Sequence, residues 1–355
     1  MYEFRYNAVM KIFHSEIHRR HNPPFEVFDG GRRVPYLESP ARMDHILSAL
    51  RKTNWADIKE PADFGLDPIL AVHDSDYLKF LASAWDEWQA PVSEFDFAPD
   101  NSALLPATFA LRRHPHKPKS LLGRAGYYMM DLSAVIVKGT YEAALSSTNC
   151  ALTGAQAIIE GEPVAFALCR PPGHHAGKDY AAGYCFINNA AVAANELSSK
   201  DKVVILDIDY HAGNGTQDIF YNRSDVLTIS IHADPAYEYP YYAGYEDEIG
   251  SGQGKGFHHN FPLPSGTDDL RYLAVLERAI GTIKTFKPKY LIVSAGVDIY
   301  DGDPFGTFKI TRQGIRQIGT KIANLELPTL FVMEGGYANE ALGENVVALL
   351  ESFVR

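Results

Sequence analysis

Short apolar runs alternate along this chain with longer segments of helical period, and this alternation limits the fold more than any other feature. Parallel strands need helical crossover connections, so the alternation predicts an α/β fold with a central parallel sheet and helices on both faces. Buried strands are predicted at 8–13, 164–168, 203–206, 226–231, 290–293 and 329–333, and helices at 40–51, 77–88, 141–160, 188–197, 268–286 and 311–323. A chain of 355 residues with 46% hydrophobic residues is long enough for one large α/β domain or two smaller ones.

Two long irregular stretches interrupt this pattern, at about residues 15–40 and 89–122. Loops of this length are uncommon in compact domains, where they line a site, contact a partner or are disordered. The second stretch contains the basic cluster 112–117, which indicates either a solvated loop or a subunit contact.

Composition and charge argue against several classes of protein. The formal net charge of −11 disfavours bulk binding to nucleic acid or to an anionic membrane. The three cysteines are too few and too scattered for a disulfide framework or a cysteine-based zinc site. The first residues show no apolar signal-peptide core, and no run reaches the roughly 18 apolar residues of a membrane span. We therefore expect a cytoplasmic protein without nucleic-acid or membrane partners.

Acidic and imidazole side chains occupy alternate positions directly after the apolar run 203–206. Because successive side chains of a strand point to opposite faces, Asp207, Asp209 and His211 share one side where the strand ends. Two carboxylates and an imidazole on one side suit a divalent metal, with further ligands arriving from elsewhere. Strand-end aspartates also cap turns, but three such groups of one parity favour a metal site.

Adjacent histidines, His174 and His175, follow the predicted strand 164–168 in the turn that begins at Arg170. Only a turn presents both rings to one cavity, and a pair beside a metal site favours general acid–base chemistry. A lone buried histidine, by contrast, is more often a satisfied core residue. Cys185 has apolar neighbours, so we expect it to pack rather than to act as a nucleophile.

Two more motifs follow predicted strands. Asp298 is the natural third protein ligand beside Asp209 and His211, and three protein ligands leave an open position for water, as in catalytic zinc sites. In the segment 334–337, two glycines allow a tight bend, and Tyr337 could aim its hydroxyl into the cavity as an oxyanion donor. As the fourth strand-end motif around one cavity, this otherwise weak pattern supports an active site.

The combination and order of these motifs resemble the histone deacetylase superfamily, and within it the bacterial acetylpolyamine amidohydrolases. The segments that carry the resemblance are 170–175, 207–216, 296–298 and 334–337. It extends from the strand before His14 to the end of the chain. It implies the open arginase-deacetylase fold, with a central eight-stranded parallel sheet and helices on both faces. It also implies a single deacetylase domain over residues 1–355 and zinc-dependent hydrolysis of amides.

Two cations are implied by the resemblance. Asp209, His211 and Asp298 would bind one catalytic Zn²⁺ per chain, although this ligand set also suits Fe²⁺ or Co²⁺. A monovalent cation, K⁺, would be held by the side chains of Asp207 and Asp209 and the carbonyls of His211 and Ile231, with Ser230 contributing.

The catalytic roles are implied in the same way. His175 would act as general base on the attacking water and later protonate the leaving amine, while Tyr337 would donate to the substrate carbonyl. His174 would orient the water and support it electrostatically, with Asp207 as its hydrogen-bond partner. Asn214 occupies the position expected for the partner of His175, and an Asn in place of an Asp leaves that histidine less cationic at rest.

Substrate contacts and assembly are also implied. Tyr184, preceded by Gly183, and Tyr239 would form aromatic walls around an acyl-amine chain of lysine-like length. The stretch 15–40 resembles the insertion by which such relatives dimerise and narrow their tunnel, so we expect a homodimer.

The substrate is where the sequence departs from the family pattern. Leu122 and Ser133 occupy positions where polyamine-selective relatives carry acidic residues, which leaves Glu26 and Asp131 as candidates to bind an amine. Ala212 replaces a histidine that usually follows the metal-ligating one. Acetylated polyamines, acetyl-lysine peptides and other small amides therefore all stay open as substrates.

Two other classes remain as alternatives. An arginase-type ureohydrolase with two Mn²⁺ ions would need the order Asp-x-His-x-Asp, whereas this chain has Asp207, Asp209 and then His211. A non-catalytic sensor of acylated amines would be expected to have lost a ligand, a histidine or the tyrosine, and none is lost. Metal stoichiometry would distinguish the first class, and turnover the second.

Overall fold

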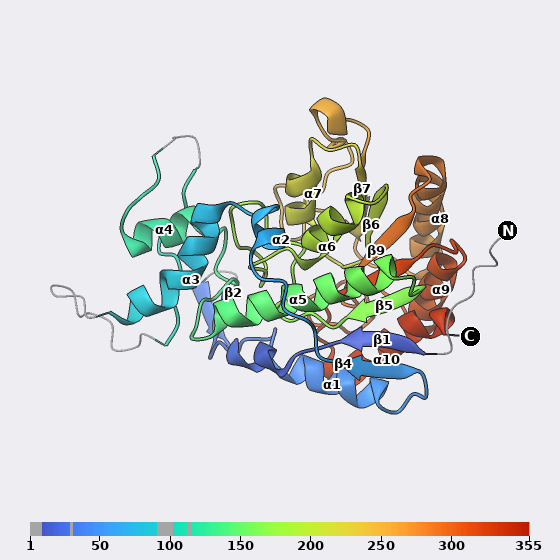
Figure 1. The fold of residues 1–355 in the computed structure, drawn as a ribbon, viewed down its shortest axis with the longest axis horizontal. Helices are drawn as coiled ribbons and strands as arrows, with labels where there is room; N and C mark the ends of the chain where they lie inside the picture. The colour runs from blue at the N-terminus through green and yellow to red at the C-terminus, as the bar shows by residue number, and fades with distance from the viewer. Residues whose placement is uncertain (1–8, 29–30, 91–101, 112–115, 355) are drawn as a thin grey trace.

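The computed structural model describes residues 9–28, 31–90, 102–111 and 116–354. Its centre is a parallel eight-stranded sheet with the strand order β4-β1-β5-β10-β9-β6-β7-β8 (Figure 1). In chain order the strands are β1 (Met10–Phe13), β4 (Ala56–Lys59), β5 (Val164–Ala167), β6 (Val203–Asp207), β7 (Val226–Ala233), β8 (His258–Leu263), β9 (Tyr290–Ala295) and β10 (Thr329–Met333).

Helices lie on both faces of this sheet (Figure 1). They are η1 (Glu16–Arg20), α1 (Ala41–Leu50), α2 (Asp67–Leu70), α3 (Ser75–Gln89), α4 (Leu121–Tyr128), α5 (Thr140–Ile159), α6 (Asn189–Ser198), α7 (Asn214–Phe220), η3 (Gly252–Gly254), α8 (Asp269–Phe286), α9 (Arg312–Ala323), α10 (Asn339–Leu350) and η4 (Glu351–Phe353). The predicted α/β class and the parallel sheet with two covered faces are therefore confirmed.

The strand side chains divide between two hydrophobic clusters, as the period of two requires. In β5, Val164 and Phe166 belong to the cluster that includes residues of α1, α8, α9 and α10, whereas Ala165 and Ala167 belong to the cluster that includes residues of α3, α5 and α6. Every residue of β5, β6, β7, β9 and β10 is buried, which explains why these strands are mainly apolar rather than alternating between apolar and polar residues.

Several elements lie outside the predicted pattern. The edge strands β4 and β8 are partly exposed and mix polar with apolar residues, so they give no apolar run. The predicted loop 15–40 contains η1 and an antiparallel hairpin of β2 (Glu26–Phe28) with β3 (Arg32–Val34). Residues 91–101 and 112–115, and with them most of the basic cluster, lie outside the described part of the chain, as does the first residue of the predicted strand 8–13.

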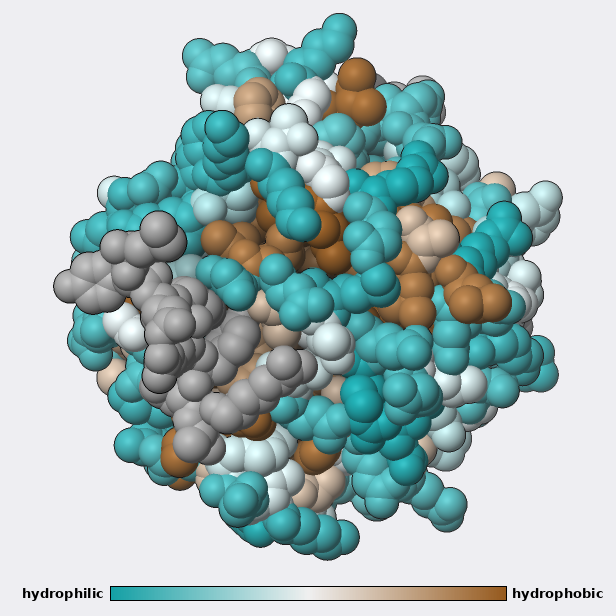
Figure 2. Space-filling view, turned by 90° about the vertical axis from the view of Figure 1, so that its right-hand side faces the viewer, coloured by the Kyte–Doolittle hydropathy of each residue, from teal (hydrophilic) through white to brown (hydrophobic). Residues whose placement is uncertain are grey.

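The side of the molecule at the right of Figure 1 is mainly hydrophilic, with apolar patches near its middle (Figure 2). Apolar atoms contribute much of any folded surface, so such patches alone do not mark a site. Within the described residues, no helix combines the length and the apolar character needed to cross a membrane.

The parallel arrangement brings all four chemical motifs to one edge of the sheet. The motifs follow β5, β6, β9 and β10, which lie next to one another in the order β5-β10-β9-β6. Parallel strands end on the same edge, and in open α/β sheets ligands bind there. The side chain of Asn188, which caps α6 through the amide of Ala191, also donates to the carbonyl of Ala176 and so ties the histidine turn to this helix.

Candidate active site

Three predicted metal ligands converge where β6 and β9 end. Asp209, His211 and Asp298 each offer one ligand atom, and these atoms lie within 4.8 Å of one another. Nδ1 of His211 is 3.3 Å from Oδ1 of Asp209 and 3.3 Å from Oδ2 of Asp298. Backbone amides orient both carboxylates, since Tyr210 donates to Oδ1 of Asp298 at 2.9 Å and Gly335 donates to Oδ2 of Asp209 at 2.8 Å.

The charge of this cluster fits a divalent cation. Both carboxylates are buried, and Oδ2 of Asp298 receives no hydrogen bond from the described residues. Burial and the neighbouring Asp209 raise the pKa of Asp298 to about 7, because two adjacent buried carboxylates repel each other when both are ionised. Burial lowers the pKa of His211, but the two carboxylates outweigh it and raise the value to about 9. Both shifts reflect an excess of buried negative charge, which a metal bound by these residues would neutralise.

Glycine is required where the backbone passes closest to the ligands. A Cβ atom at Gly335 would lie 2.4 Å from Oδ2 of Asp298, and one at Gly296 would lie 2.1 Å from Oδ2 of Asp209. Neither position can therefore carry a side chain without displacing a carboxylate. This explains physically why the motifs 296–298 and 334–337 contain glycine at these places.

The two histidines of the turn after β5 have different partners. Nδ1 of His174 is 3.0 Å from Oδ2 of Asp207, and Nδ1 of His175 is 2.6 Å from Oδ1 of Asn214. Burial lowers the pKa of His174, but Asp209 and Asp207 raise it well above its usual value. Burial and the adjacent His174 hold the pKa of His175 well below its usual value. The pair thus combines one cationic and one neutral ring, whose centroids are 3.9 Å apart.

The amide partner also fixes which nitrogen of His175 is free. With Oδ1 of Asn214 as the acceptor, Nδ1 of the neutral ring carries the proton. Nε2 of His175 then keeps its lone pair, which is the state that a general base requires. A carboxylate in place of Asn214 would instead stabilise the protonated ring.

The loop after β10 is fixed from two sides. Oδ2 of Asp303 accepts hydrogen bonds from the amides of Tyr337, at 2.6 Å, and Ala338, at 2.9 Å. Arg42, from α1, donates to the carbonyls of Gly336 at 2.8 Å and Glu334 at 2.6 Å, and its guanidinium lies 4.8 Å from the centroid of the Tyr337 ring. Tyr337 is 8% exposed, so its ring is held in place by these neighbours.

Glu334, Arg42 and Asp303 were not assigned roles from the sequence. Oε2 of Glu334 accepts hydrogen bonds from the amides of Gly173 and His174, at 2.7 and 3.1 Å, and so links the β10 motif to the histidine turn. Arg42 and Gly336 are 294 positions apart, so no local motif points to their contact. Asp303 stands in the segment after Asp298, but nothing in its spacing indicates that it caps the loop of Tyr337.

The aromatic wall residues meet the two candidate carboxylates. The hydroxyl of Tyr184 donates to Oε2 of Glu26 at 2.5 Å, and the hydroxyl of Tyr239 donates to Oδ2 of Asp131 at 2.6 Å. The ring of Tyr184 packs against Tyr337, with centroids 5.9 Å apart, and the ring of Tyr239 lies edge-on to His175 at 4.9 Å. Both walls are therefore next to the catalytic candidates.

Both carboxylates accept further hydrogen bonds from the protein. The second oxygen of Glu26 accepts from the amide of Leu37 at 3.0 Å. Oδ1 of Asp131 accepts from the amide and hydroxyl of Ser133, and its Oδ2 accepts from the amide of Gly183 at 2.8 Å. Gly183 itself lies against His175, since a Cβ there would be 2.2 Å from Cδ2 of that ring.

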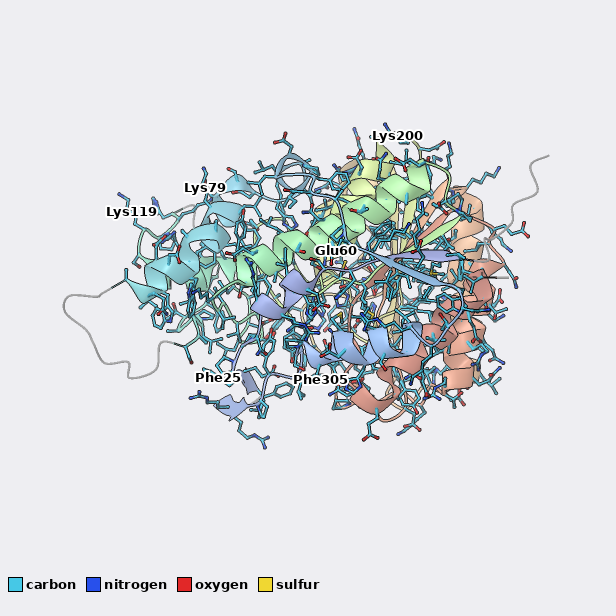
Figure 3. The ribbon with its side chains drawn as sticks, turned by 60° about the horizontal axis from the view of Figure 1, so that its bottom comes forward. Phe25, Glu60, Lys79, Lys119, Lys200 and Phe305 are labelled. Atoms are coloured by element: carbon cyan, nitrogen blue, oxygen red, sulfur yellow. The ribbon has the colours of Figure 1, made fainter. Side chains whose placement is uncertain are left out.

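Aromatic residues from distant segments extend this wall. Phe28 stacks on Phe305 with ring centroids 5.4 Å apart, and Phe305 meets the ring of Tyr337 edge-on at 4.6 Å. Figure 3 shows Phe25, which precedes β2, on the same side of the molecule as Phe305. The hairpin within 15–40 thus reaches the active-site edge.

Three of the residues predicted to hold a monovalent cation, Asp207, Ser230 and Ile231, lie on the neighbouring strands β6 and β7. Asp207 on β6 pairs in register with Ser230 on β7, and Ile231 follows on the same strand. A cavity of about 10 Å³ is lined by Asp207, Ser230 and Gly213 among others, which is enough for one small ion or water. The hydroxyl of Ser230 is 2.7 Å from Nδ1 of His232.

The chain matches the histone deacetylase domain over residues 36–353. It belongs to the histone deacetylase family. Acetylpolyamine amidohydrolase 2 of Pseudomonas aeruginosa is 44% identical over 347 residues, which cover 97% of this chain and 98% of the relative. The acetylpolyamine amidohydrolase of Mycoplana ramosa is 43% identical, with coverage of 96% and 99%.

Among histone deacetylase structures, the crystal structure of acetylpolyamine aminohydrolase from Burkholderia pseudomallei aligns with a TM-score of 0.91. It is 37% identical in sequence and covers 97% of this chain and 98% of that one. The family resemblance and the predicted eight-stranded histone deacetylase fold are thus confirmed. Membership also makes the chain a deacetylase-type hydrolase.

Proposed function

We propose that this histone deacetylase family member removes acetyl groups from acetylated polyamines by zinc-dependent hydrolysis within a single domain. The relatives that match nearly the whole chain carry the name acetylpolyamine amidohydrolase. One structural observation carries the chemistry: the neutral base candidate His175 lies beside the cluster of Asp209, His211 and Asp298, whose buried charge fits a divalent ion.

Each protein group has a distinct task in the proposed reaction. Asp209, His211 and Asp298 would hold a Zn²⁺ ion, which would supply Lewis-acid chemistry that makes water acidic at about pH 7 and polarises the amide carbonyl. Nε2 of His175 accepts a proton from the attacking water and later returns it to the leaving amine nitrogen. The cationic His174, held by Asp207, stabilises the negative charge that develops on oxygen. The hydroxyl of Tyr337 donates a hydrogen bond to the carbonyl oxygen of the substrate.

Tyr184 and Tyr239 would enclose the alkyl chain of the substrate. Their hydroxyls are engaged by Glu26 and Asp131, so we assign these carboxylates to the support of the walls rather than to direct contact with the amine. As two acidic groups behind an aromatic lining, they would still favour a cationic substrate electrostatically. Acetyl-lysine peptides and small amides share the same acyl group and remain the second candidate substrates.

A potassium ion and a homodimer complete the proposal. The small cavity lined by Asp207 and Ser230 supports K⁺ binding next to the partner of His174. Exposed apolar side chains within 15–40, at Ile17, Phe28 and Leu37, support a subunit contact through this segment. Light scattering coupled to size exclusion would give the mass of a single chain if the dimer does not form.

Removal and return of the metal tests the proposed chemistry. Chelation should abolish release of free amine from N-acetylputrescine, and stoichiometric Zn²⁺ should restore it. The variant Asp298→Asn keeps the shape of the ligand but removes a negative charge, so it should remain inactive after zinc is returned. Full activity of the metal-free protein would contradict a metal-dependent hydrolase.

A further inference from the structure

A second group of metal-type ligands lies where β1 ends and η1 begins. His14, Glu16 and His18 each offer one ligand atom, and these atoms lie within 4.8 Å of one another. The group shares no residue with the cluster at Asp209, His211 and Asp298. Ser15 starts η1 by accepting a hydrogen bond from the amide of Ile17, and this short turn brings the two histidines together, with ring centroids 5.0 Å apart.

The two imidazoles are buried without the partners that buried polar groups normally have. His14 is 5% exposed and His18 is 3% exposed. In the described part of the chain, neither ring nitrogen of His14 nor Nε2 of His18 has a hydrogen bond of ordinary geometry, although Oε1 of Glu16 and the backbone of Leu168 lie near the His14 ring. Since buried polar atoms are almost always satisfied, three such nitrogens in one place indicate a missing ligand.

The protonation states suit a cation. Burial lowers the pKa of His14, and burial together with the adjacent Arg170 lowers that of His18 to about 2. Both rings are therefore neutral near pH 7 and keep a lone pair for a metal. Nδ1 of His18 is 3.4 Å from Nη1 of Arg170, which leaves Nε2 as the ligand atom.

Negative charge is available at the open side of the group. Oε1 of Glu16 is 3.5 Å from Nε2 of His14, while its Oε2 accepts a hydrogen bond from Nε of Arg19 at 2.6 Å. Arg19 is shared with a second carboxylate, Asp44, so these three side chains carry a net charge of about −1. Glu60, which follows β4, adds further negative charge near His14. The Glu38 carboxylate, 3.0 Å from Nε of Arg170, is shared with Arg42 and offsets part of the charge of these two guanidinium groups.

We propose that His14, Glu16 and His18 form a second, structural site for a divalent transition-metal ion. Two imidazoles and one carboxylate suit Zn²⁺, Co²⁺ and Ni²⁺, whereas Ca²⁺ and Mg²⁺ prefer sets of oxygen ligands. Oε1 of Glu16 already faces His14, and the side chain is 57% exposed, so water reaches the remaining position. The ion would join the end of β1 to η1.

The site would also stabilise the region behind the catalytic turn. The carbonyl of His18 accepts a hydrogen bond from Nη1 of Arg170 at 2.7 Å, and Arg170 begins the turn that carries His174 and His175. A metal that holds η1 in place would therefore hold this contact as well. The expected consequence is a metal-dependent rise in thermal stability that does not require the catalytic ion.

The number of bound zinc ions tests this proposal. Equilibrium dialysis against zinc, followed by elemental analysis, should show one ion fewer per chain for Glu16→Gln than for wild type. The matched control is Asp44→Asn, which removes the other carboxylate partner of Arg19 but no proposed ligand, and should bind as many ions as wild type. His14→Phe keeps a ring of similar shape at the same buried position and should also lose one ion.

Repeating the comparison in Asp298→Asn removes the contribution of the catalytic cluster. In that background, Zn²⁺ should raise the melting temperature of the protein, and the added change Glu16→Gln should remove the effect. Co²⁺ should give visible absorption bands that are lost with the same change. Equal zinc counts and equal melting shifts for Glu16→Gln and Asp44→Asn would overturn the proposal and leave the two histidines as neutral packing residues.

Discussion

The hydrogen bond between His175 and Asn214 allows a specific prediction about the proposed base. Nδ1 of the histidine and Oδ1 of the amide are 2.6 Å apart, and Asn214→Asp changes neither the size nor the shape of the partner. The substitution therefore places a full negative charge in hydrogen-bond contact with the ring. An opposite charge at this range typically shifts a pKa by about 1–3 units toward the charged form. The pKa of His175, now held low by burial and by His174, should rise accordingly.

The sign of the effect on activity follows from the role of the ring. His175 acts as a base only while it is unprotonated, so a higher pKa moves the acid limb of the kcat/KM profile to higher pH. We expect a displacement of about 1–3 pH units for N-acetylputrescine hydrolysis, measured across roughly pH 5 to 9. Asn195→Asp, which adds the same charge beside Arg223, is the control and should leave the limb unchanged. An unshifted acid limb in folded Asn214→Asp would refute the assignment of His175 as the base.

Three further substitutions test the other parts of the site. Tyr337→Phe should lower kcat by about 10²–10³-fold, as for loss of an oxyanion donor, yet melt within a few degrees of wild type because the ring contacts remain; near-normal turnover would remove Tyr337 from the mechanism. Gly335→Ala should lose zinc in dialysis, since its Cβ would lie 2.4 Å from Oδ2 of Asp298, and retention of the ion would contradict this ligand geometry. Glu26→Gln should raise KM for acetylated diamines by more than KM for an acetyl-lysine peptide, because it removes negative charge behind Tyr184; equal changes would separate Glu26 from amine selection.

Local sequence patterns were sufficient where a strand is buried along its whole length. β6 and β10 are almost entirely apolar because helices cover both faces of the sheet. The candidate active-site residues stand at their ends or follow immediately. The edge strands β4 and β8 have one open side and a mixed composition, so their pattern resembles that of a loop. The number of eight strands came from the family resemblance, not from the pattern itself.

The candidate site divides in the same way. Asp207, Asp209 and His211 are close in sequence, so the sequence alone places all three at or just beyond the end of β6. The supports of the site depend on tertiary contacts that no spacing reveals. Arg42 reaches the loop of Tyr337 across 294 positions, and Asp131 joins two segments that both lie against His175. The sequence predicted that Asp131 could bind the amine of the substrate, but its hydrogen bonds to Gly183 and Tyr239 are visible only in the folded chain.

The choice of substrate is the most direct test of the proposed function. The zinc-loaded protein should be supplied with N-acetylputrescine, N-acetylcadaverine and an acetyl-lysine peptide side by side, with kcat/KM obtained from the release of free amine or of acetate. We predict turnover of all three acyl amines and a clear preference for the two acetylated diamines. A preference for the peptide would contradict the polyamine assignment and favour a lysine deacetylase, and absence of turnover with any of them would contradict the enzymatic account.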